Sequence, residues 1–234
     1  MLADTHEIPL LTLPAVLFPG TFLPMQAIEE PHRTLLRDCV REDWQVGVVL
    51  TSQGEHSHYA SIPFMTGCLA SVALVAHSDD DAQDDEPLGV VLYGERRIRV
   101  VEFVQQDPYL TVRVEMLAEH EDPNAGRRTE RVAILFKKYL DLIQNFYKSD
   151  ILDFTLPHDP TAASYILASI LCLPLQMKQR WLESVSTRDR LEEQAAYLQA
   201  ECDRHELLLH LSRTHQHRYS LPDQRLYLAL NGQN

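Results

Sequence analysis

Apolar and polar side chains alternate along two stretches in the first half of the chain, "WQVGVVL" at residues 44–50 and "YLTVRVEM" at residues 109–116. A period of two places successive side chains on opposite faces of an extended chain, so both stretches predict half-buried strands. Two longer apolar stretches lie between them, at residues 68–78 and 88–104. Several short strands joined by turns favour a barrel or another closed sheet, which leaves few exposed edges.

Local signals refine this β region. Tyr93-Gly94-Glu95 offers a turn, and the alternation slips near Val100-Val101, which predicts a β-bulge. One helix interrupts the strands, because Pro31 suits a first helical turn. Its inward-facing side chains are predicted to be Leu35, Leu36 and Val40.

The apolar run "IPLLTLPAVLFPGTFLPM" at residues 8–25 carries Pro9, Pro14, Pro19 and Pro24. Prolines at this spacing exclude a helix and a central sheet strand, because each removes a backbone donor. The run therefore predicts short strand pieces separated by turns, with Pro19-Gly20 as the strongest turn signal. A membrane span is a poor interpretation of a run that proline breaks this often.

The periodicity changes after "EDPNAGRR" at residues 121–128, where proline, asparagine and glycine interrupt the pattern. Apolar residues then recur at steps of three and four from Val132 to Phe146, which predicts an amphipathic helix. Further helices are expected from Asp159-Pro160 to before Pro174, around residues 176–184 and from about Arg188. We therefore predict an α+β protein with a β-barrel at residues 1–120, a helical bundle at 127–212 and a weakly ordered tail at 213–234.

Charge is distributed unevenly over the 234 residues. The net charge is −13, and residues 1–120 hold 7 Lys and Arg against 19 Asp and Glu. Six of these acids lie in the loop at residues 79–86, which predicts a solvated loop rather than a calcium site, because it lacks the spacing of an EF-hand. A surface of this sign repels phosphate backbones, so nucleic acid is not an expected partner.

Residues that would carry chemistry are scattered. The four cysteines form no C-x-x-C pair and are expected to be reduced thiols of a cytoplasmic protein. No phosphate-binding loop, G-x-S-x-G, H-E-x-x-H or G-x-G-x-x-G motif occurs. The pairs His56-x-His58 and His215-x-His217 are predicted to be surface histidines rather than metal ligands. We therefore predict no catalytic, cofactor-binding or metal-binding residue, although a triad assembled by folding leaves no such motif.

Four stretches, at residues 8–25, 28–50, 93–117 and 159–198, together resemble the N-terminal, substrate-binding domain of Lon proteases. The run at residues 8–25 is similar to the L-P-L…V-x-F-P-G…L-P-L opening of that domain, and "IEEPHRTLLRDCVREDWQVGVVL" to its F-E-x-R-Y…helix…F-G-V-V segment. Ile28, Pro31 and His32 depart from the commonest residues. "YGERRIRVVEFVQQDPYLTVRVEML" and "DPTAASYILASILCLPLQMKQRWLESVSTRDRLEEQAAYL" resemble the later blocks. The resemblance spans residues 7 to about 210.

The resemblance implies a PUA-like β-barrel followed by helices. Full-length Lon continues into ATPase and Ser-Lys protease modules, and the resemblance implies that only the recognition part is present here. The chain is then expected to bind polypeptide clients or a partner protein such as a protease, without cofactor, membrane or chemistry of its own. Its oligomeric state is left open. The candidate protein-binding residues are Phe64, Tyr93, Arg96, Arg97 and Tyr109.

Structural roles compete with this interpretation of the candidate residues. The three aromatic candidates also suit a core or strand position. The two arginines are the nearest donors for a carboxylate, but one of an adjacent pair is expected to be a solvated strand arginine. A small-molecule site or a hydrolase with dispersed active-site residues, and RNA binding as in other PUA-type barrels, are the alternative functions.

Overall fold

The computed structural model describes residues 5–51, 63–76, 88–120, 125–147 and 154–215. Contacts divide the chain into two units, of which the first holds residues 1–118 and 175–185 and the second holds residues 119–174 and 186–234. No helix in the described ranges is long and apolar enough to cross a membrane. The acidic loop at residues 79–86 and the pair His56-x-His58 fall outside the described residues, as does His217.

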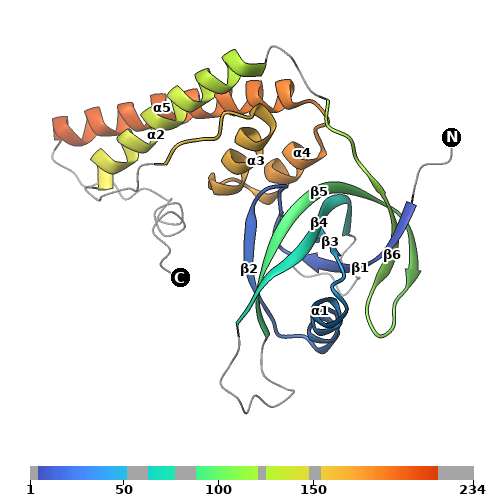
Figure 1. The fold of residues 1–234 in the computed structure, drawn as a ribbon. Coiled ribbons are helices and arrows are strands. Elements are labelled where there is room, and N and C mark those ends of the chain that lie inside the picture. The colour runs from blue at the N-terminus through green and yellow to red at the C-terminus, as the bar shows by residue number, and fades with distance from the viewer. Residues whose placement is uncertain (1–4, 52–62, 77–87, 121–124, 148–153, 216–234) are drawn as a thin grey trace. The chain divides into compact units, whose positions relative to one another are not determined.

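The first unit is built on one six-stranded sheet (Figure 1). Its strands run in the order β2-β5-β4-β3-β1-β6, and β5 also pairs with β6, so the pairings return to β5 as a ring. β1 and β3 are parallel, and the other pairs are antiparallel. The elements of this unit are β1 (Thr5–Leu13), β2 (Phe22–Ala27), α1 (Glu30–Glu42), β3 (Val46–Thr51), β4 (Pro63–Ala76), β5 (Leu88–Gln105), β6 (Thr111–Met116) and α4 (Leu175–Glu183).

β5 pairs with three neighbours, β2, β4 and β6, and its register against β4 and β6 shifts along its length. Its pairing with β6 shifts between Val100 and Glu102, so the predicted bulge is confirmed. The turn offered by Tyr93-Gly94-Glu95 is not formed, because β5 continues through it. Gly94 instead allows a close approach, since a Cβ there would lie 2.3 Å from the Phe18 carbonyl oxygen.

The proline-rich run forms strand pieces joined by a turn, as predicted, but the exclusion of a central strand was wrong, because β1 pairs with both β3 and β6. Pro9 lies in β1 where that strand ends its pairing with β6, and Pro24 lies in β2, for which β5 is the one partner among the described strands. Residues 14–21 connect the two strands. The turn at Pro19-Gly20 is confirmed, and Gly20 has a φ of +75°, which a side chain would strain.

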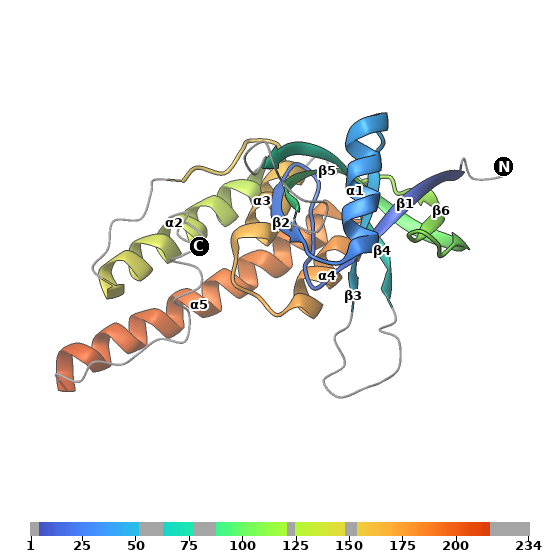
Figure 2. The ribbon, with the colours of Figure 1, turned by 90° about the horizontal axis from the view of Figure 1, so that it is seen from below.

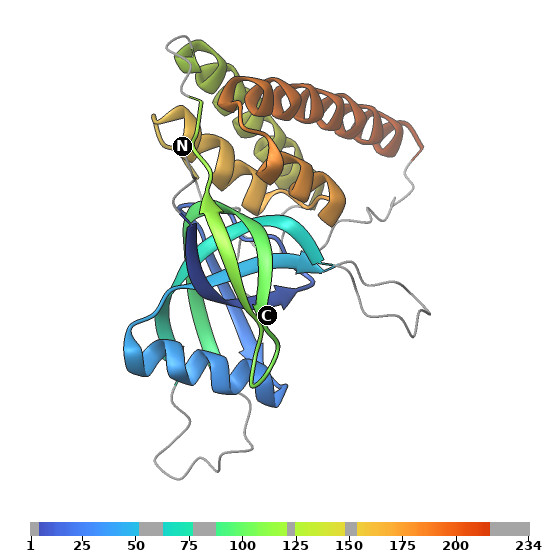
Figure 3. The same cartoon turned by 90° about the vertical axis from the view of Figure 1, so that its right-hand side faces the viewer.

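α1 lies along one end of the strands (Figure 3). Pro31 stands in its first turn, and Leu35 and Leu36 are buried as predicted. The prediction for Val40 was wrong, because its side chain is 48% exposed and Cys39 takes the inward position. At about 100° per residue, Cys39 rather than Val40 shares the face of the two leucines. These three α1 residues join a core with β-sheet residues that include Leu11, Val46, Val48, Cys68, Ala70 and Leu92.

The second unit is helical. It comprises α2 (Ala125–Tyr147), α3 (Pro160–Ile170) and α5 (Thr187–His215). α2 and α5 pack against each other along their lengths (Figure 2), and both contact α3. The predicted start of α3 is confirmed, because the Asp159 carboxylate accepts a 2.6 Å hydrogen bond from the Ala162 N–H and Pro160 follows the cap.

α4 belongs with the sheet rather than with the other helices. The Gln179 side chain donates a 2.9 Å hydrogen bond to the carbonyl oxygen of Thr66 on β4, and the Trp181 ring is buried. The predicted helical region at residues 127–212 is thus divided by its contacts, with residues 175–185 in the first unit and the remainder in the second. The predicted domain limits stay a prediction, and residues 216–234 of the predicted tail lie outside the described residues.

Candidate functional site

A cavity of about 790 Å³ opens in the first unit, a volume in the range of small-ligand and side-chain pockets. Its walls come from the start of β1, the end of α1, the chain entering β3, the middle of β4 and β5, and the segment leading into β6. Both apolar and polar residues line it, including Trp44 and Tyr109. We call this the β3-end cavity.

The C-terminus of α1 positions Trp44 in the wall of the β3-end cavity. Asp43 ends the helix in the left-handed conformation, with φ 54° and ψ 42°. The Trp44 N–H then donates a 2.9 Å hydrogen bond back to the Cys39 carbonyl oxygen, and the chain turns into β3. Trp44 remains 49% exposed. A large aromatic side chain held half open to solvent by a defined backbone is typical of a binding surface.

Tyr109 is held by a hydrogen bond to α1. Its hydroxyl donates to the Asp38 carboxylate at 3.1 Å, while its ring packs against the core beneath α1. Burial, and then the Asp38 carboxylate, raise the pKa of Tyr109, so the hydroxyl stays a neutral donor. The predicted candidate Tyr109 therefore lies in a cavity wall in a fixed orientation.

The thiol in the cavity wall is unsuited to nucleophilic chemistry. Burial raises the pKa of Cys39 to about 11, and Asp38 adds to the rise. The pKa of Cys68 is raised to about 12, again by burial. A thiol must ionise to attack a substrate, so both cysteines suit packing and not catalysis at neutral pH.

Carboxylates set the charge of the β3-end cavity. Glu7, Asp43 and Glu95 line it, and no Lys, Arg or His is among the described residues of the lining. Glu7 forms a 2.7 Å ion pair with Arg113 outside the lining, and Glu95 accepts a hydrogen bond from the Gln45 side chain. Within the described ranges, Asp43 and Glu95 take part in no ion pair. The cavity is therefore net acidic.

A second exposed feature is an aromatic pair on β2 and β5. Phe22 stands opposite Tyr93 in the register, their ring centroids are 5.0 Å apart, and Phe22 is 64% exposed. Leu74 on the neighbouring β4 is also exposed. The sequence pointed to Tyr93 but not to Phe22, because the pairing of the two rings depends on the register of strands far apart in the chain.

The other predicted candidates lie elsewhere. Phe64 is half-buried at the start of β4, and Arg96 is exposed on β5. The structure does not bring them into the β3-end cavity or the aromatic pair. Of the five candidates, only Tyr109 lines the cavity.

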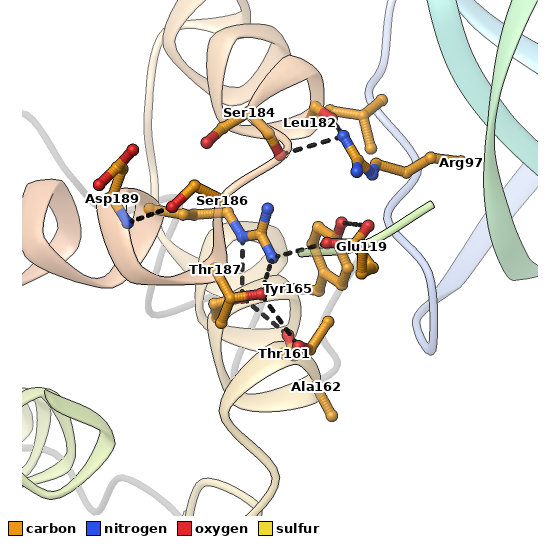
Figure 4. A network of polar contacts seen from close by, with 12 residues as sticks. Arg97, Glu119, Thr161, Ala162, Tyr165, Leu182, Ser184, Ser186, Thr187 and Asp189 are labelled. Atoms are coloured by element: carbon orange, nitrogen blue, oxygen red, sulfur yellow. Dashed lines mark hydrogen bonds and ion pairs between the residues drawn. The ribbon is translucent and has the colours of Figure 1, made fainter. Parts of the chain in front are cut away.

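Arg97 has a structural role. Its side chain is buried, with 1% exposure, and Nη1 donates to the carbonyl oxygens of Leu182 and Ser184 at 3.1 and 3.0 Å (Figure 4). Nη2 donates to the Ala118 carbonyl oxygen at 2.9 Å. A cation at the C-terminus of α4 satisfies carbonyls that the helix leaves without partners and complements its dipole. These contacts leave Arg97 unsuited to receive an incoming carboxylate.

Another buried arginine organises the second unit. Arg190 lies over the Tyr165 ring, 4.0 Å from its centroid, and donates to the Ser164 hydroxyl at 2.8 Å. Glu119 supplies the counter-charge at 3.5 Å and also accepts from the Tyr165 hydroxyl (Figure 4). The network joins α3, α5 and the segment before α2, so we assign it to the stability of this unit.

No group of three or more His, Cys, Asp or Glu in the described part of the chain is arranged to hold a metal ion. This statement does not extend to the histidine pair at residues 56–58 or to the acidic loop, which are not described.

Comparisons with known proteins point to one family. The model of the ATP-dependent protease La (LON) substrate-binding domain matches residues 7–200. Lon protease 2 of Myxococcus xanthus is 28% identical over an aligned length of 191 residues, and the match covers 76% of this chain and 21% of that protein. Lon protease 2 of Herpetosiphon aurantiacus is 25% identical over an aligned length of 213 residues, and the match covers 89% of this chain and 26% of that protein. The chain thus spans about a fifth to a quarter of these relatives.

Two solved structures share the fold. A Lon N-terminal domain protein from Xanthomonas campestris has a TM-score of 0.58 and 23% identity, covering 82% of this chain and 98% of that one. The N-terminal domain of the Mycobacterium avium complex Lon protease has a TM-score of 0.59 and 17% identity, covering 83% and 98%. With the family model matching most of its length, the chain belongs to the Lon substrate-binding domain family.

Proposed function

We propose that the chain is a polypeptide-recognition module that performs no chemistry itself and presents clients to a separate protease or other machine in the cytoplasm. The ring of strand pairings is, in this proposal, the PUA-like barrel of the family, and the helices of the second unit form a bundle. Clients are expected to be unfolded or extended polypeptides. Neither nucleic acid nor a membrane is an expected partner, given the net charge of −13.

The observation that carries the proposal is the half-exposed Trp44 in the β3-end cavity. Aromatic side chains contribute much of the binding energy at protein interfaces because they bury a large area at a small entropic cost. The cavity volume of about 790 Å³ can accept one or two side chains of an extended client. The thiol in the wall is not activated, which supports binding without catalysis.

A binding titration tests the proposal. The probe is reduced, carbamidomethylated α-lactalbumin carrying a fluorescent label, whose blocked thiols carry no added charge, and fluorescence anisotropy measures its affinity for the wild type and for Trp44→Ala. Loss of a buried aromatic anchor costs about 2 kcal/mol or more, so we expect affinity to fall at least tenfold. Ile134→Ala is the matched control, because Ile134 is 70% exposed on α2 and distant in sequence from the cavity.

Three results are informative. Weaker binding for Trp44→Ala with unchanged binding for Ile134→Ala supports the proposal. Equal losses in both variants, or none in either, contradict the assignment to the β3-end cavity. Absence of binding by the wild type contradicts polypeptide recognition as the function.

A further inference from the structure

We infer that the β3-end cavity selects polypeptide segments that carry a Lys or Arg side chain, which it binds between the Trp44 ring and the carboxylates of Asp43 and Glu95. This inference rests on the proposed function and adds the chemistry of the client. The binding site is the β3-end cavity, and the negative charges in its wall favour a positively charged side chain as the occupant.

The aromatic component of the site is Trp44. The indole presents a π face, and at 49% exposure much of the side chain is open to an incoming group. Trp is the strongest of the aromatic side chains in attracting a cation over its face. The same ring packs against the methylene stem of a Lys or Arg, so one side chain satisfies both the apolar and the electrostatic character of the wall.

The charged component of the site consists of the carboxylates of Asp43 and Glu95. Glu7 shares the Arg113 guanidinium with Glu102, so Asp43 and Glu95 are the lining acids that take part in no ion pair within the described ranges. Gln45 holds the Glu95 carboxylate through a hydrogen bond without neutralising it. Asp43 stands at the C-terminus of α1, where the helix dipole already favours a cation. A positive side chain in this cavity would therefore meet two carboxylates and a helix terminus of the same sign.

Charge complementarity also excludes other occupants. An acidic client side chain would be repelled by the same groups, and the part of the lining that the structure describes offers no Lys, Arg or His to receive it. A purely apolar side chain would contact Trp44 but leave the carboxylates of Asp43 and Glu95 without a counter-charge. The net charge of −13 adds a general attraction for basic segments, which salt weakens, whereas contacts inside the cavity are screened less.

Three peptides separate selection in the cavity from general attraction. They share the sequence Gly-Ser-Leu-X-Phe-Ser-Gly with blocked termini, and X is Lys, norleucine or Glu. Norleucine keeps the apolar stem of Lys and lacks its charge. Binding is followed in 0.15 M salt by the emission of Trp44, since the other tryptophan, Trp181, is buried. We expect the Lys peptide to bind at least fivefold more tightly than the norleucine peptide, and the Glu peptide to bind most weakly.

The variant Asp43→Asn with Glu95→Gln removes both charges and keeps the shapes. Asn tolerates the left-handed conformation of residue 43, so the variant is expected to fold. The control is Glu130→Gln with Asp141→Asn, two exposed acids of α2, which changes the net charge by the same amount. The Lys preference should fall below twofold in the first variant and persist in the control.

The outcomes distinguish this inference from the proposed function. Equal affinities for Lys and norleucine in the wild type, or a Lys preference that survives in the Asp43→Asn, Glu95→Gln variant, overturn the cation selection while polypeptide binding stands. A preference lost equally in both variants overturns it as well, because general charge would then explain it. If none of the peptides nor unfolded α-lactalbumin binds, both proposals fail together.

Discussion

Replacing Arg97 with Ala tests the structural role assigned to this residue. The substitution removes a buried guanidinium that donates to four carbonyl oxygens, those of Ala118, Leu182, Glu183 and Ser184. A hydrogen bond from a charged donor contributes about 1.5–3 kcal/mol, but water can enter the space left by the side chain and satisfy some of the carbonyls. We therefore expect a loss of about 3–4 kcal/mol in the free energy of unfolding.

The assay for Arg97→Ala is thermal unfolding followed by Trp181 emission, since this buried ring lies on α4, whose C-terminus the guanidinium caps. The expected loss lowers the melting temperature by roughly 6–15 °C for a chain of this size. Arg96→Ala is the matched control, because Arg96 is the exposed neighbour on the same strand and its loss should stay within about 0.5 kcal/mol. Melting temperatures for the two variants within 2 °C of each other would refute the reasoning.

Three further predictions concern other parts of the molecule. Gly94→Ala should destabilise the first unit by several kcal/mol, because its Cβ would lie 2.3 Å from the Phe18 carbonyl oxygen; urea unfolding measures this, and a variant as stable as the wild type would contradict the close approach. Burial raises the pKa of Cys39 from 9.0 to about 11, so its contribution to the free energy of unfolding is fully present below pH 9 and is lost as pH rises toward 11. At pH 8 the thiol of the folded chain should therefore react with Ellman's reagent far more slowly than the thiol of the unfolded chain. Finally, the purified chain should neither hydrolyse ATP nor cleave casein, and either activity co-purifying through two columns would disprove the absence of chemistry.

Much of the secondary structure follows from local patterns. The alternation of period two, the bulge near Val100 and the Asp159 cap depend on residues close together in the chain, so the sequence predicts them. The error at Val40 is a matter of helix phase, which a short helix with few apolar residues specifies loosely. The prediction of a turn at Tyr93-Gly94-Glu95 was wrong, because Gly94 instead allows β5 to approach the backbone of Phe18 closely.

The candidate site was less predictable, because it depends on tertiary contacts. Arg96 and Arg97 are adjacent and identical in type. Only the residues that pack against each face of β5 show that Arg96 is exposed and Arg97 is buried. In the sequence, Trp44 is one of several apolar residues in an alternating pattern. In the structure, the backbone turn at Asp43 places it in a cavity wall. The one available signal was an acidic residue and a Trp directly after a helix, at a position that favours Gly or Asn.

The most direct test of the central claim uses the two tryptophans as internal probes. In the ¹⁵N-labelled protein, the indole N–H groups of Trp44 and Trp181 give two separate NMR signals, one from the β3-end cavity and one from the buried face of α4. On addition of unlabelled, unfolded α-lactalbumin, the account predicts that the Trp44 signal shifts or broadens with saturation while the Trp181 signal stays in place. An unchanged Trp44 signal under conditions where the polypeptide binds would contradict the account.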